Sequence, residues 1–162
     1  MNTNQQQLLV QCALNSWEIQ VSRATKAFHQ LSDEDLFLEI APDRNRAVYL
    51  LGHLVAVHDA MIPLLGFGER QYEFLDDTFL NNPDREGEKL PPVKDLRAYW
   101  KNINSIITEQ FRKLKPEEWL EKHTAISDED FAREPHRNRL SVLLNRTNHI
   151  SYHIGQLALL KK

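Results

Sequence analysis

Hydrophobic residues recur every three to five positions along four long segments of the chain. These segments run from about 4 to 30, from 45 to 65, from 92 to 114 and from 139 to 160. Such spacing places hydrophobic side chains on one face of an α-helix, and no segment shows the alternation of a convincing strand. The pattern therefore predicts an all-α fold, a four-helix bundle with helices about 30 Å long.

Residues that favour helix ends mark where several of these segments begin and stop. Ser32 precedes an acidic run and is a candidate N-cap of a short helix, and Asn45 is the corresponding candidate for the second long helix. Pro63 is expected to kink that helix or to mark its last turn, and Gly66 is expected to end it. Pro116 is typical of the first position of a further short helix.

Two long connections interrupt the helical pattern, at residues 66–91 and 122–138. Connections of this length within a compact domain are usually crossovers, lids or mobile segments. We therefore expect a bundle with long crossover connections, and a single domain that spans residues 1–162.

The second long segment is apolar on nearly all sides and approaches the length of a membrane span. It contains His53, His58, Asp59 and Pro63, which are costly in an isolated span, and no second such segment follows. A helix of this kind is also typical of the centre of a soluble bundle. The first residues are polar and show no export signal, so we expect a cytoplasmic protein that does not bind a membrane.

The composition excludes several classes of protein. The net charge is −3, so no global positive field attracts nucleic acid, and five glycines are few for a nucleotide-binding α/β domain. The single cysteine, Cys12, cannot form an internal disulfide, and we expect it to be a buried, inert thiol. The seven histidines stand out, and they direct the search for a functional site.

Two of these histidines, His149 and His153, lie four positions apart on the last helix. There they stand one turn apart on the same face, separated by about 40°, and can chelate one ion. Asn145 and Gln156 fall on the same polar strip and Tyr152 lies beside it, so these three are candidates to line a pocket or to orient the histidines. Ordinary hydrogen bonds between helices, or a chance pair on an exposed face, would explain the same spacing.

His53 lies in the middle of the apolar stripe of the second long helix. A buried imidazole needs partners for its ring nitrogens, either hydrogen-bonding groups or a metal. Taken alone, it is explained by a bond to a carbonyl in the core. Three histidines on two helices, each facing the core, fit the plan of a catalytic metal site with three protein ligands and one further position.

The segments LLGHLVAVHD and NHISYHIGQL resemble the two signature regions of the DinB/YfiT-like family of metal-dependent helical bundles. (This DinB is the DNA-damage-inducible protein, not the polymerase of the same name.) The order of helices is similar over nearly the whole chain. The resemblance implies one divalent metal ion on His53, His149 and His153, with zinc or nickel favoured.

The resemblance also implies two kinds of enzyme. One is a transferase in which the metal activates a low-molecular-weight thiol for attack on a small electrophile, and the other is a hydrolase that activates water. A hydrolase would benefit from a carboxylate near the metal as a general base, and none shares the face of the paired histidines, which favours the transferase. The long connections could still bring Asp76, Asp77, Glu134 or His136 to the site.

A non-catalytic bundle that binds a metal or ligand, or that forms a homodimer, is a third possibility. The expected partners are a small-molecule substrate, a low-molecular-weight thiol and a second copy of the chain. Arg133, His136, Arg137 and Arg139 form a basic cluster, which indicates a solvated loop or an anion clamp and not a nucleic-acid site. The histidines that need no functional explanation are His29, His58 and His123.

Overall fold

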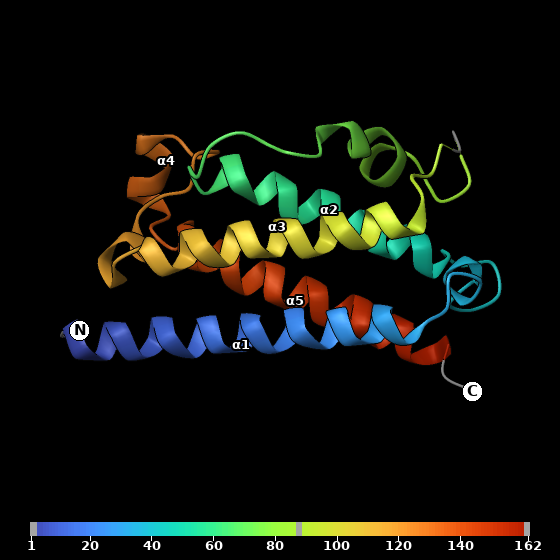
Figure 1. The fold of residues 1–162 in the computed structure, drawn as a ribbon. Coiled ribbons are helices and arrows are strands. Elements are labelled where there is room, and N and C mark those ends of the chain that lie inside the picture. The colour runs from blue at the N-terminus through green and yellow to red at the C-terminus, as the bar shows by residue number, and fades with distance from the viewer. Residues whose placement is uncertain (1–2, 87–88, 161–162) are drawn as a thin grey trace.

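The computed structural model describes residues 3–86 and 89–160. Its long helices are α1 (Thr3–Gln30), α2 (Ala47–Leu64), α3 (Val93–Lys113) and α5 (Arg139–Leu157), with the short α4 (Asp128–Arg133) before the last (Figure 1). Short 3-10 helices cover Asp35–Phe37, Glu73–Leu75, Pro116–Leu120 and Ala158–Leu160. A π-helical turn covers Asp77–Asn81. Residues 3–86 and 89–160 form no strand, and the all-α bundle prediction is confirmed.

The four long helices are arranged in the directions up, down, down and up. α1 and α5 run side by side in one direction, whereas α2 and α3 run the opposite way (Figure 1). Ring contacts agree with this arrangement, because Trp17 and Phe28 of α1 meet Phe111 and Trp100 of α3 in reverse order. Since α2 and α3 are parallel, the chain returns along the bundle between them, and residues 66–86 and 89–91 form the described part of this crossover.

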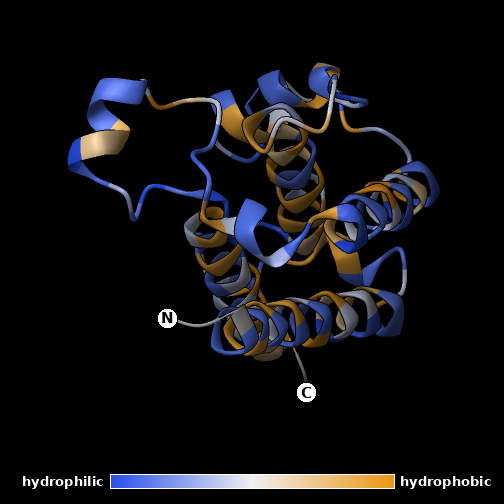
Figure 2. Cartoon of the chain, turned by 90° about the vertical axis from the view of Figure 1, so that its left-hand side faces the viewer, coloured by the Kyte–Doolittle hydropathy of each residue, from blue (hydrophilic) through white to orange (hydrophobic). Residues whose placement is uncertain are grey.

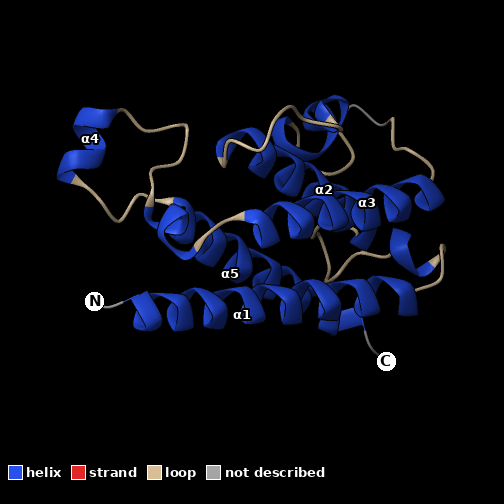
Figure 3. Ribbon diagram, turned by 60° about the vertical axis from the view of Figure 1, so that its left-hand side comes forward, coloured by secondary structure: helices blue, strands red, loops and turns tan. Residues whose placement is uncertain are grey.

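The second long connection, residues 122–138, joins two antiparallel helices. It was expected to be irregular, but it contains α4, whose first turn is capped by the side chain of Ser127. No residue of α4 is buried, and the helix projects from the bundle at the end where α5 begins (Figure 3). Before α4, the connection is attached to the end of α2, because the N–H of Thr124 donates to the carbonyl of Leu64 at 3.0 Å.

Hydrophobic side chains fill the space between the helices. The hydrophobic positions of the helices are coloured orange in the end-on view (Figure 2). The aromatic part of this core joins Trp17, Phe111 and Trp119, with neighbouring ring centroids 5.0–5.7 Å apart. α2 has the length and hydropathy of a membrane span, yet 78% of that window is buried inside the bundle. The apolar character of α2 is thus explained by its central position.

Most of the predicted helix ends are where the sequence places them. Pro63 lies in the last turn of α2, and Gly66 follows that helix with a φ of 77°. The cap residue of the short helix is Glu34 and not Ser32, although the side chain of Ser32 accepts the N–H of Asp35 at 3.0 Å. The prediction that Asn45 caps α2 is wrong. The cap residue is Arg46, whose N–H donates to Asp84 of the crossover at 2.7 Å, so a distant carboxylate replaces the local cap.

The prediction of a buried Cys12 is also wrong, because Cys12 is exposed. α1 turns Val10, Ala13 and Trp17 toward the core. Two positions along a helix correspond to a rotation of about 200°, so Cys12 lies on the face opposite Val10. The lone thiol therefore lies on the outer face of α1.

Candidate metal centre

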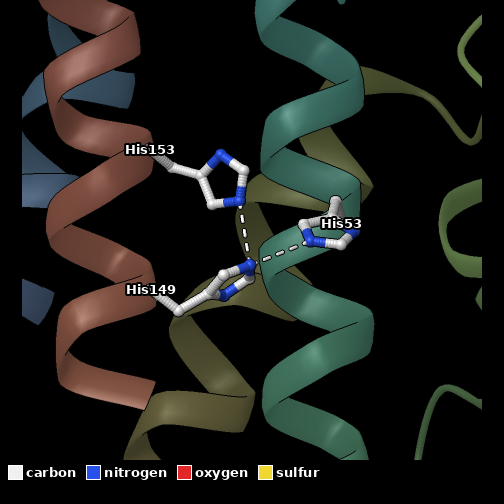
Figure 4. Close-up of side chains that lie close together, drawn as sticks. All are labelled: His53, His149 and His153. Atoms are coloured by element: carbon white, nitrogen blue, oxygen red, sulfur yellow. Dashed lines mark hydrogen bonds between the residues drawn. The ribbon is translucent and has the colours of Figure 1, made fainter. Parts of the chain in front are cut away.

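Three histidines meet between α2 and α5. Nε2 of His149 lies 3.2 Å from Nε2 of His53 and 3.0 Å from Nε2 of His153, and one ligand atom of each residue lies within 4.8 Å of the other two. The imidazoles converge on a common point from the two helices (Figure 4). The antiparallel course of α2 and α5 brings the distant sequence positions together.

The position of His53 depends on a close contact between α2 and the crossover. The ring of Phe79 lies directly against Gly52, where any Cβ would overlap its atoms. The ring is fully buried, and the backbone carbonyl of the same residue lies 2.9 Å from Nδ1 of His53. Glycine immediately before the histidine thus allows the crossover to approach α2 and to supply a partner for His53.

Hydrogen bonds on the outer nitrogens set the direction of the inner ones. A carbonyl only accepts, so Nδ1 of His53 donates to Phe79 and the neutral ring turns the Nε2 lone pair inward. Oε1 of Gln156 accepts from Nδ1 of His153 at 2.7 Å, which orients His153 in the same way. Outer hydrogen bonds of this kind accompany nearly all metal-binding histidines.

The donor set fits a divalent ion. Nitrogens bound tetrahedrally at 2.0–2.1 Å from one ion are roughly 3.3 Å apart, which is close to the two separations observed here. Nδ1 of His149 is buried and has no hydrogen-bond partner among the described residues. Ligation through Nε2 would therefore leave the third histidine without the outer acceptor that the other two have.

Burial keeps the histidines in the neutral form that binds metals. Removal from water, together with the neighbouring His153 and His53, lowers the pKa of His149 to about 4. Burial is also the main cause that lowers the pKa values of His53 and His153. At neutral pH the three rings are therefore uncharged, and the inner nitrogens of His53 and His153, whose protons lie on Nδ1, present lone pairs for a metal.

A cavity of about 260 Å³ opens beside the three rings. Its lining comes from the start of α2, the crossover and α5, and comprises Asn45, Tyr49, Leu50, His53, Phe79, Leu80, His149, Tyr152 and His153. No carboxylate is among these residues. The acidic residues that the connections could have delivered are placed elsewhere, since Asp76 pairs with Arg70 and Glu134 pairs with Arg137.

Of the residues predicted to surround the histidines, Gln156 and Tyr152 lie beside them, whereas Asn145 lies at another cavity. Gln156 contacts His153, and its Nε2 donates to the hydroxyl of Tyr152 at 3.2 Å, so these residues form a chain that leads to the cavity. Asn145 is exposed and lines a different cavity, one turn earlier on α5. On the helical wheel Asn145 belongs to the predicted polar strip, but the residues of that strip line two separate cavities.

Two contributors to the site are not apparent from sequence patterns. The carbonyl of Phe79 is a backbone group on an irregular segment, and only Gly52 beside His53 hints at the close approach. Arg146 is the other, because its charge contributes to the lowered pKa values of His53 and His149, after burial in both cases. A basic residue three positions before His149 is the signal that could have indicated it.

Comparison with known families adds independent support to this picture. Residues 16–157 match the model of the DinB superfamily, which covers all four long helices in part or in full and all three histidines. No curated protein matches the sequence.

Proposed function

The chain belongs to the DinB superfamily, and on that basis we propose that it holds one divalent metal ion, zinc or nickel, on His53, His149 and His153 and transfers a low-molecular-weight thiol to a small electrophile. The observation that carries the proposal is the convergence of three inward-facing imidazole nitrogens beside a cavity. We place this reaction in the cytoplasm.

The residues of the chain have separate tasks in the proposed reaction. The three histidines hold the ion, and Phe79 and Gln156 keep two of them in the correct orientation. The ion, when bound, stabilises the thiolate form of a thiol that reaches it. The cavity holds the electrophile beside that sulfur, where proximity favours bond formation.

In the transfer step the sulfur forms a bond to the electrophilic carbon. The leaving group departs with the electron pair of the broken bond, and the thiol proton is released to water. Tyr152 can donate a hydrogen bond to the leaving group, because its oxygen accepts from Gln156. The hydroxyl of Tyr49 is instead engaged with the carbonyl of Asn82 at 2.8 Å.

The cavity lining favours transfer of a thiol over hydrolysis. Activation of water is assisted by a general base, and the described residues around the cavity include no carboxylate to fill that role. A thiol is acidic enough to lose its proton to solvent once its anion is stabilised. Cys12 lies on the outer face of α1, so the thiol comes from a separate molecule.

Metal analysis tests the site directly. We expect about one divalent ion per chain in protein purified without an affinity tag, and its loss in H53A, H149A and H153A. H29A is the matched control, since His29 is exposed on α1 and its removal should leave the metal content unchanged. Equal metal content in all four variants would exclude the three histidines as ligands.

Activity is tested with the metal-loaded protein, a small thiol and a generic electrophile. The proposal predicts turnover that requires both the thiol and the metal. Turnover of an ester or amide without any thiol would support a hydrolase instead, and metal-loaded protein that turns over neither substrate would favour a binding function.

A further inference from the structure

A second cavity, of about 210 Å³, lies between the end of α2 and the first turns of α5. It is bounded by Leu64 at the end of α2, by the connection 122–138 and by the first turns of α5. This volume is below that of a site for a complete drug-sized ligand and suits one end of a small molecule. Its polar lining includes His123, Asn145 and Arg146.

Arg146 lacks the counterion that its arginine neighbours have. Arg137 pairs with Glu134 at 2.9 Å, and Arg139 pairs with Glu121 at 2.9 Å. Arg146 is half-buried, its Nε is fully buried without a partner, and no described residue accepts a hydrogen bond from its guanidinium. A guanidinium shielded from water in this way is costly unless an anion compensates it.

The one unpaired arginine charge at this cavity would be balanced by a ligand with a single negative charge. Arg137 is neutralised by its pairing with Glu134, so Arg146 supplies the uncompensated positive charge. His123 contributes a neutral donor, since burial and then Arg137 lower its pKa, and its Nδ1 accepts the N–H of Ala125 at 3.2 Å. The proton of the neutral ring is therefore on Nε2.

We infer that this cavity binds the carboxylate group of a small molecule on the guanidinium of Arg146. A planar guanidinium binds a carboxylate with two parallel hydrogen bonds, and a monoanion balances the one free charge better than a phosphate dianion does. This is a binding site distinct from the three histidines.

The location of the carboxylate site relates it to the proposed metal centre. Arg146 precedes His149 by three residues, which corresponds to about 4.5 Å along the helix axis and the same side of α5. A molecule anchored on Arg146 would extend along α5 toward the histidines. We therefore assign the acidic end of one of the two reactants to this cavity, an assignment that rests on the proposed function.

Acetate binding to the metal-free protein tests the site without any contribution from the metal. At constant ionic strength, acetate should shift the Nε–H resonance of Arg146 in NMR spectra. We expect R146Q to weaken acetate binding at least tenfold, in line with the loss of a charge-assisted bidentate contact. R133Q is the matched control, because Arg133 is exposed on α4 outside the cavity, and it should bind acetate like the wild type.

Several results would overturn the inference. These are equal acetate affinity in R146Q and wild type, a resonance shift confined to other residues, or tighter binding of inorganic phosphate than of acetate. If R146Q does not fold, the titration of the Arg146 resonance in the wild type still decides the matter. H153A, which tests the metal centre, should keep acetate binding, so the acetate titration distinguishes a failure of this inference from a failure of the proposed metal site.

Discussion

The backbone carbonyl of Phe79 accepts a hydrogen bond from Nδ1 of His53 at 2.9 Å, while the ring of Phe79 lies against Gly52. One residue of the crossover thus fixes both the approach of the connection to α2 and the orientation of a metal-ligand candidate. Because both contacts come from one residue, a shift of the backbone at Phe79 would change both of them.

Gly52→Ala tests this link. The added methyl would overlap the ring of Phe79, which is fully buried. We expect the free energy of unfolding to fall by about 2–3 kcal/mol, as for an overpacked core. We also expect weaker zinc binding in competition titrations with a chromogenic chelator, because the displaced carbonyl no longer orients His53.

Gly155→Ala is the control for Gly52→Ala. Gly155 lies inside α5 with no atom within 4 Å of a built Cβ. Replacing a helical glycine by alanine in open space should raise stability by roughly 0.5–1 kcal/mol and leave zinc affinity unchanged. Equal zinc affinity in wild type and Gly52→Ala would show that the Phe79 carbonyl does not support the site.

Gln156→Leu tests the hydrogen bond behind His153. The leucine removes the acceptor of the 2.7 Å bond from Nδ1, so the ring loses its fixed orientation. Loss of such an outer partner lowers metal affinity by about 10–100-fold. Tyr152→Phe tests the next hydrogen bond, from Gln156 to the Tyr152 hydroxyl. This variant keeps the contact between Gln156 and His153, so zinc affinity should persist although the hydroxyl beside the cavity is lost.

The long helices and the three histidines were predictable because both depend on regular spacing. The i, i+4 pair on α5 and the apolar stripe around His53 follow from helical geometry, whichever connection surrounds them. The contacts of irregular segments were not predictable. Asp84 occupies the N-terminus of α2 in place of Asn45, and Phe79 approaches His53, through non-local contacts that no local pattern encodes.

Asp59→Asn tests how the crossover is attached to α2. The carboxylate is fully buried and accepts from the side chain of Arg70 at 2.9 Å and from the N–H groups of Gln71 and Tyr72 at 2.7 and 3.0 Å. The amide removes the charge and faces these donors with an NH₂ group. We expect a loss of about 3 kcal/mol in urea unfolding, as for a broken buried ion pair.

Asp33→Asn is the matched control for this attachment. Asp33 also pairs with an arginine, Arg97 at 3.2 Å, but its side chain is 70% exposed. Exposed pairs contribute about 0–1 kcal/mol, so this variant should unfold nearly like the wild type. Similar losses in the two variants would argue against a special role of Asp59 in holding the crossover.

His58 gives a prediction about pH and stability. Its ring is completely buried between Trp17 and Trp100, with ring centroids 4.9 and 5.0 Å away, and Nδ1 lies 3.0 Å from Oδ1 of Asn104. Burial lowers the pKa of His58 from 6.5 to about 3. Between these two values the unfolded chain binds a proton at this residue and the folded chain does not.

Stability should therefore rise with pH across this window, and the contribution of His58 is complete above pH 6.5 and lost as the pH falls toward 3. One such group changes the free energy of unfolding by up to about 1.4 kcal/mol per pH unit. Urea unfolding followed by tryptophan fluorescence should show that the free energy of unfolding falls less between pH 7 and pH 5 for H58Q than for wild type, by about 2 kcal/mol.

The histidines of the metal centre contribute to both proteins and cancel in this difference. H29Q, altered at an exposed position, should follow the wild type. The same pH dependence in H58Q and wild type would mean that the buried ring is protonated in the folded protein, which its complete burial makes unfavourable.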